Sequence, residues 1–131
     1  MERLYVWSPR VLSVLRIIVA LLFMEHGFMK LFQFPGPQPG APSPLPLILT
    51  IAGALEIFGG AHILIGLFTR PFAFLLSGMM AVAYFTAHAS QGFWPGLNGG
   101  EPAILYCFVF LYFVFQGGGE WSIDAQVRKK P

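Results

Sequence analysis

The chain has 131 residues, of which 56% are hydrophobic and only 11% are charged, and its formal net charge is +2. A mean hydropathy of +0.67 is too apolar for an ordinary water-soluble domain, so residues 1–131 are expected to form one integral membrane domain. The charge comes mostly from the chain ends and forms no basic stripe. This excludes a nucleic-acid partner and makes the lipid membrane the expected surroundings.

Four apolar runs approach the length of about 20 residues that a membrane-spanning helix needs. We expect helices at about 11–32, 47–68, 71–90 and 102–118, the last being the shortest. The predicted fold class is therefore all-α, an integral membrane four-helix bundle. The first run is too long for a cleavable signal peptide and lacks a small-residue cleavage site, so the mature protein should keep it.

Basic residues predict the orientation of this bundle. If all four runs cross the membrane, only Lys30 lies near one side and six other cations lie near the opposite side. By the positive-inside rule, both termini and the turn at 66–71 are cytoplasmic. The six cations are Arg3, Arg10, Arg70, Arg128, Lys129 and Lys130.

The predicted external segment at 35–46 contains six prolines in twelve residues and no charge. It should be extended and polyproline-like, since proline continues neither flanking helix. It is either a stiff connector or a lid over the outer mouth of the bundle. In the other external loop, Glu101 begins the fourth helix, where the helix dipole favours a carboxylate without any chemistry.

Small residues predict which helix faces are buried, because helices in membranes approach one another through them. On the first helix Ser13, Ala20 and Gly27 recur every seven residues, and Arg16 and Lys30 share their side. On the second helix, the stripe at 52, 56, 59, 63 and 66 turns Glu56 toward other helices. The stripes proposed for the last two helices are Ser77, Ala81, Tyr84 and His88, and Glu101, Leu105, Phe108 and Tyr112.

Each unpaired charge at mid-depth would cost about 2.5–3.5 kcal/mol, so the buried charges should be paired. The expected contact is Arg16 with Glu56 or Glu25. We predict a polar pocket that opens outward and is closed from below by Arg16. His88 and Glu101 are placed nearer the outer surface by a rise of about 1.5 Å per residue.

Within this pocket, Glu56 and His26 are the candidate catalytic residues, because each could exchange protons in an apolar bundle. The candidate substrate-binding residues are Arg16, Lys30, His88 and Glu101. His26 and Lys30 lie four residues apart and could together hold an anionic or carbonyl head group. Alternatively, Lys30 reaches to the outer interface, His26 bonds a neighbouring helix, and Glu56 forms a structural ion pair with Arg16.

We expect no metal site, because the histidines and glutamates lack a compact ligand motif and differ in depth. No covalently bound cofactor is expected either. Cys107 is the single cysteine, so it forms no internal disulfide and is interpreted as a small packing residue.

Several motifs in order along the chain resemble the DoxX family. They are Leu15-Arg16-Ile17, His26-Gly27 with Lys30-Leu31-Phe32, Glu56-Ile57-Phe58-Gly59-Gly60, Gly66-Leu67-Phe68-Thr69-Arg70, His88, Gly92-Phe93, Gly99-Gly100-Glu101, and Trp121-Ser122-Ile123-Asp124-Ala125. The resemblance covers residues 12–125 and implies a four-helix protein of the bacterial inner membrane. The family is similar to small subunits of thiosulfate:quinone oxidoreductases, although the proline-rich segment departs from its usual pattern.

The leading hypothesis is a quinone-interacting or redox-linked subunit of a membrane oxidoreductase. A quinone is then the expected ligand, and other oxidoreductase subunits or a second copy of the chain are the expected partners. The alternative is a non-catalytic membrane scaffold or a small-solute permease, with the buried charges of a scaffold serving only to fix helix register. A permease would be supported by broken helices, which the sequence does not clearly signal.

Overall fold

The computed structural model describes residues 1–129, so the predicted contribution of Lys130 to orientation lies outside the described residues. The described residues contain helices and no β-strand, which confirms the all-α prediction. In chain order they are α1 (Glu2–Tyr5), α2 (Ser8–Phe32), α3 (Leu47–Ile65), α4 (Thr69–Ala83), the π-helical turn η1 (Tyr84–His88), the 3₁₀ turn η2 (Ala89–Gln91), α5 (Pro95–Asn98), α6 (Glu101–Gln116) and α7 (Ile123–Gln126).

Three helical segments are long and apolar enough to cross a membrane: α2, α3 and the continuous helix at 69–91. The fourth apolar helix, α6, has 16 residues and is shorter than such a span. α3 ends three residues before the predicted boundary because Gly66 takes a left-handed conformation with φ of 71°. The predicted turn at 66–71 therefore occupies Gly66 to Phe68, and α4 begins at Thr69.

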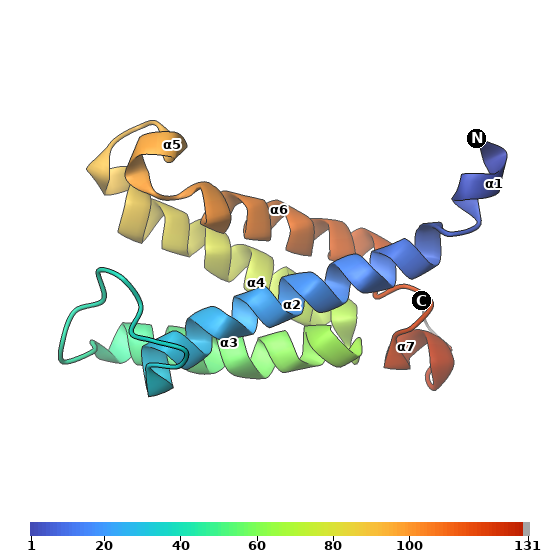
Figure 1. Ribbon diagram of the computed structural model, residues 1–131, viewed down its shortest axis with the longest axis horizontal. Coiled ribbons are helices and arrows are strands. Elements are labelled where there is room, and N and C mark those ends of the chain that lie inside the picture. Colours follow the sequence, from blue (N-terminus) through green and yellow to red (C-terminus); the bar gives the residue numbers. More distant parts are fainter. Residues whose placement is uncertain (130–131) are drawn as a thin grey trace.

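The long helices pack as two arms, with α2 against α3 in the first arm and α4 against α6 in the second. A smaller contact between α3 and α4 joins the arms. In Figure 1 the arms meet at the end that carries both termini and α7, and they diverge toward the opposite end. Both described ends of the chain therefore lie at the closed end of the molecule.

Aromatic residues fill the core where the two arms meet. The ring of Phe23 on α2 packs edge-on against Tyr106 and Phe110 of α6, with centroids 5.3 and 4.9 Å apart. The other buried apolar side chains of this core are Ala20, Ile63, Ala73, Leu76, Met80 and Phe113.

The inward face predicted for α6 is wrong. Leu105, Phe108 and Tyr112 are 65%, 63% and 50% exposed, and Glu101 is exposed as well. The buried face instead carries Ala103, Phe110 and Phe113. The stripe could not be located because α6 has bulky apolar residues all round, and lipid accommodates such side chains as well as a protein core does.

A short C-terminal segment, residues 117–128, ties the arms together at the closed end; we call it the C-terminal clamp. Asp124 accepts hydrogen bonds from the backbone N–H groups of Phe68 and Thr69 at 2.9 and 2.8 Å, which caps the start of α4. Its other partner is Arg128, at 3.0 Å. Burial alone would raise the pKa of Asp124, but these hydrogen bonds hold the pKa below its ordinary value.

Candidate functional site

A buried ion pair joins the two helices of the first arm. Lys30 Nζ on α2 lies 2.7 Å from Oε1 and 2.9 Å from Oε2 of Glu56 on α3. The two side chains are only 11% and 4% exposed. Because both carboxylate oxygens accept from one ammonium group, each charge compensates the other inside an apolar surrounding. The prediction that Glu56 faces other helices is confirmed.

Two glycines allow this pair to form. A Cβ added to Gly27 would lie 2.7 Å from the backbone oxygen of Gly53, so the two backbones touch at this point of the seam between α2 and α3. Gly53 in turn has Lys30 and Leu31 against it. The close approach brings the two charged side chains within hydrogen-bond distance, which larger residues at the crossing would prevent.

His26 lies on α2 one turn before Lys30 and is half-buried. Its ring is edge-on to Tyr106 of α6, with centroids 6.0 Å apart. Gln38 Nε2, from the proline-rich segment, donates a long hydrogen bond of 3.5 Å to His26 Nδ1. With Nδ1 as acceptor, the neutral ring carries its proton on Nε2 and keeps one donor for another group.

The predicted pairing of Arg16 with Glu56 or Glu25 is wrong. The Arg16 side chain is fully buried and donates to four backbone oxygens, those of Ile63, Leu64, Gly118 and Trp121, at 2.6 to 3.2 Å. Fourteen residues separate Arg16 from Lys30 along α2, a rise of about 21 Å. Arg16 therefore closes the end of the molecule that holds the termini and lies far from the ion pair.

His88 and Glu101 belong to the second arm and are not brought to the Lys30–Glu56 pair. His88 ends the π-helical turn η1 and donates from Nδ1 to the backbone oxygen of Asn98 at 3.1 Å. Glu101 is exposed at the start of α6. The π-helical turn has no clear signal in the sequence, and such irregularities are frequent at functional sites.

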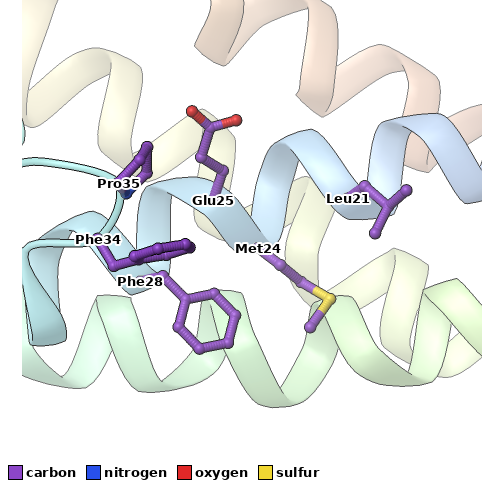
Figure 2. A pocket seen from close by; sticks show the side chains of 6 residues that line it. All are labelled: Leu21, Met24, Glu25, Phe28, Phe34 and Pro35. Atoms are coloured by element: carbon purple, nitrogen blue, oxygen red, sulfur yellow. The ribbon is translucent and has the colours of Figure 1, made fainter.

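A cavity of about 370 Å³ lies against α2 and the chain that follows it. Figure 2 shows its six lining side chains, among which Glu25 is the one charged group. None of the four residues predicted to line the polar pocket, Arg16, His26, Lys30 and Glu56, contributes to this cavity.

Sequence reasoning missed three polar residues that hold the candidate residues in place. Tyr106 contacts His26, Gln38 bonds it, and the buried Asn98 holds the loop beside His88. Asn98-Gly99 is a common turn dipeptide, which was a usable signal for a structured loop. Gln38 carries no such signal, because a glutamine among prolines is typical of any exposed connector.

Cys107 is free, and its Sγ lies 3.6 Å from Ser77 Oγ. Within residues 1–129, no three side chains of histidine, cysteine, aspartate or glutamate come together as a metal-binding group would.

Comparison with known proteins places these features in a family context. The model of the DoxX family matches residues 11–89. An uncharacterized protein of Haemophilus influenzae is 44% identical over 99% of this chain and 100% of its own length. The inner membrane protein YqjF of Escherichia coli is 31% identical, covering 89% of this chain and 92% of its own. No solved structure matches the chain.

Proposed function

Because the chain belongs to the DoxX family and is a multi-pass inner-membrane protein, we propose that it binds a quinone head group beside the Lys30–Glu56 pair. In this proposal it is the quinone-interacting, redox-linked subunit of a membrane oxidoreductase. The observation that carries the proposal is a titratable ion pair at lipid depth, with a half-buried histidine one turn away.

The chemistry of these groups suits a quinone. A quinone presents two carbonyl oxygens on a flat apolar ring, and its isoprenoid tail dissolves in the bilayer. The ammonium group of Lys30 and the Nε2–H of His26 are donors on one side of α2, four residues apart. The ring of Tyr106, which contacts His26, adds an aromatic surface beside the same donors.

Reduction of a quinone to a quinol takes up two electrons and two protons. In this proposal a reducing partner subunit supplies the electrons. The two protons come from water by way of Glu56 and His26, each of which takes up a proton before it donates one to a quinone oxygen. Lys30 stabilises the negative charge that develops on the ring oxygen.

The proposed orientation has both termini on the cytoplasmic side and α6 as a fourth crossing. Two features support it. The described ends of the chain share one end of the molecule. The segments near that end carry four cations, Arg3, Arg10, Arg70 and Arg128. The Lys30–Glu56 pair then lies in the outer half of the bilayer.

Binding of a short-chain quinone analogue to the purified protein in nanodiscs tests the function. We expect Glu56→Gln and His26→Ala to weaken binding by about tenfold each, the value of one lost charged or well-placed hydrogen bond. Thr86→Val is the matched control, because the Thr86 hydroxyl is exposed and, among residues 1–129, bonds only the backbone oxygen of Val82 on its own helix. Unchanged affinity in both site variants, with folded protein, would refute the proposal.

A second candidate function, a non-catalytic scaffold, is favoured by the fact that Lys30, Glu56 and Arg16 already have hydrogen-bond partners within the protein. Lys30 and Glu56 form a pair, and Arg16 is bonded by four backbone oxygens. The double variant Lys30→Met with Glu56→Gln separates the two functions. A scaffold should keep its fold and its cellular role when both charges are removed, because an apolar pair can replace a buried ion pair. A quinone-binding subunit should keep its fold and lose its role.

A further inference from the structure

The cavity on α2 contains a charged group that the proposed function does not use. Its lining residues are Leu21, Met24, Glu25, Phe28, Phe34 and Pro35. In Figure 2 Glu25 lies on one side of α2, Met24 and Phe28 extend toward α3, and Phe34 and Pro35 come from the chain that follows α2. The cavity thus combines an apolar wall, two aromatic rings and a single carboxylate.

Glu25 forms no ion pair with any residue in the described part of the chain. Within residues 1–129 its side chain makes no hydrogen bond and no ion pair, although it is exposed on a helix that crosses the membrane. Lys30, the nearest cation along α2, is bonded by both oxygens of Glu56. A carboxylate left in this state is disfavoured in lipid and attracts a cation.

Glu25 lies inside α2 rather than at its outer end. It lies seven residues before Phe32, the last residue of α2, which is about 10 Å along the helix axis. Side chains on a helix tilt toward its N-terminus, so Glu25 leans away from the outer end of α2. A lysine or arginine side chain at this depth could extend to the membrane interface. The glutamate side chain is shorter and leans in the opposite direction.

We propose that this cavity binds a hydrophobic organic cation, with its charge against Glu25 and its apolar groups against Phe28, Phe34 and Leu21. Phenylalanine faces attract a cation and also bury apolar groups. The volume of about 370 Å³ is at the lower end of the range for small-molecule sites, so the ligand is compact. Such a ligand neutralises the carboxylate and enters from the lipid, where hydrophobic cations concentrate.

Binding of tetraphenylphosphonium to the full chain in nanodiscs, corrected for uptake by empty nanodiscs, tests this site. We expect Glu25→Gln to weaken binding by about tenfold or more, because the charge partner is lost. Phe28→Leu should weaken it by about threefold through the lost aromatic face. The uncharged analogue triphenylphosphine oxide should bind weakly to the parent. Its affinity for the Glu25→Gln variant should be the same as its affinity for the parent.

Two variants serve as controls. Glu2→Gln removes an exposed carboxylate of α1, and Phe85→Leu removes a 71% exposed ring outside the cavity; both should bind the cation like the parent. Glu25→Gln alters an exposed side chain that has no hydrogen-bond or ion-pair partner within residues 1–129, so it should fold. Phe34→Ala gives a second test in the segment after α2. Equal binding by the parent and Glu25→Gln would overturn the proposal and leave the cavity as a place for acyl chains only. Binding of the neutral analogue as tightly as the cation would overturn it too.

Discussion

Arg16 is a buried cation in an apolar molecule. Its hydrogen-bond partners are backbone oxygens rather than a carboxylate. Two of those oxygens belong to Ile63 and Leu64 in the last turn of α3, where helix carbonyls lack intrahelical partners and the helix dipole favours a positive charge. The other two belong to the C-terminal clamp, at Gly118 and Trp121. A single guanidinium group therefore fastens three parts of the chain.

Arg16→Lys should destabilise the protein although it keeps the charge. One ammonium group cannot reach the oxygens bonded by Nε, Nη1 and Nη2, so about three hydrogen bonds are lost, equivalent to about 2–4 kcal/mol. Thermal unfolding in mild detergent measures this loss as a lower midpoint. Arg3→Lys, at an exposed position of α1, is the control and should unfold like the parent. An unchanged midpoint for Arg16→Lys would contradict the role given to the guanidinium group.

Asp124 predicts how stability depends on pH. Its pKa is below the ordinary value of about 3.9 in the folded protein, so its stabilising effect is complete above that value and is lost as the pH falls through the folded pKa. We therefore expect the thermal unfolding midpoint to decrease as the pH is lowered below about 4. Asp124→Asn should flatten the plot of unfolding midpoint against pH in this range. Glu120→Gln, which removes a partly exposed ion pair with Arg10, should leave the curve nearly unchanged.

The seam between α2 and α3 depends on small residues at the level of whole helices. Gly27 meets Gly53, and a Cβ at Gly60 would lie 3.7 Å from the backbone oxygen of Ala20. One further turn toward the closed end, Arg16 meets the end of α3. These contacts step along α2 and α3 in opposite directions and define one antiparallel register.

Gly27→Ala should weaken this seam. The added methyl group would lie 2.7 Å from the backbone oxygen of Gly53, so the helices must separate, at a cost of about 1–3 kcal/mol. Gly78→Ala is a matched control, since a Cβ at Gly78 has no atom within 4 Å, and it should be neutral or slightly stabilising. Unfolding midpoints of the two variants compare them directly, and equal midpoints would show that the seam tolerates a side chain.

The helices and the buried sides of α2 and α3 could be predicted from the sequence, because apolar length and heptad spacing report them directly. The partner of Glu56 could not be predicted from the sequence. Arg16 and Lys30 lie on the same face of α2, and either could pair with Glu56 until the register between α2 and α3 is known. Opposing Gly27 to Gly53 would have fixed that register and selected Lys30 rather than Arg16. The contacts of Gln38 and Tyr106 with His26 depend on loop folding and on the packing of α6, which have no periodic signal.

At the scale of the whole molecule, the clamp and the core hold the two arms together at one end only. The loops at 33–46 and 92–100 lie at the opposite end, where the arms diverge in Figure 1. The proposed orientation places both loops on the outer side of the membrane.

Labelling with an impermeant thiol reagent tests the orientation. In a Cys107→Ala background, Ser43→Cys and Leu97→Cys lie in the two loops and should be labelled on intact spheroplasts. Leu97 is 87% exposed. Glu2→Cys should be labelled only after the membrane is opened. Labelling of Glu2→Cys on intact cells would reverse the orientation, and labelling of Ser43→Cys without Leu97→Cys would mean that the helix at 69–91 does not cross the membrane.

The lengths of the helices also have a consequence for the surrounding bilayer. α2, with 25 residues, extends about 37 Å, whereas α6, with 16 residues, extends about 24 Å, against a hydrocarbon thickness of about 30 Å. Lipid next to α6 must become thinner, while α2 must tilt or project. A partner that covers α6 would relieve the thickness mismatch on that side.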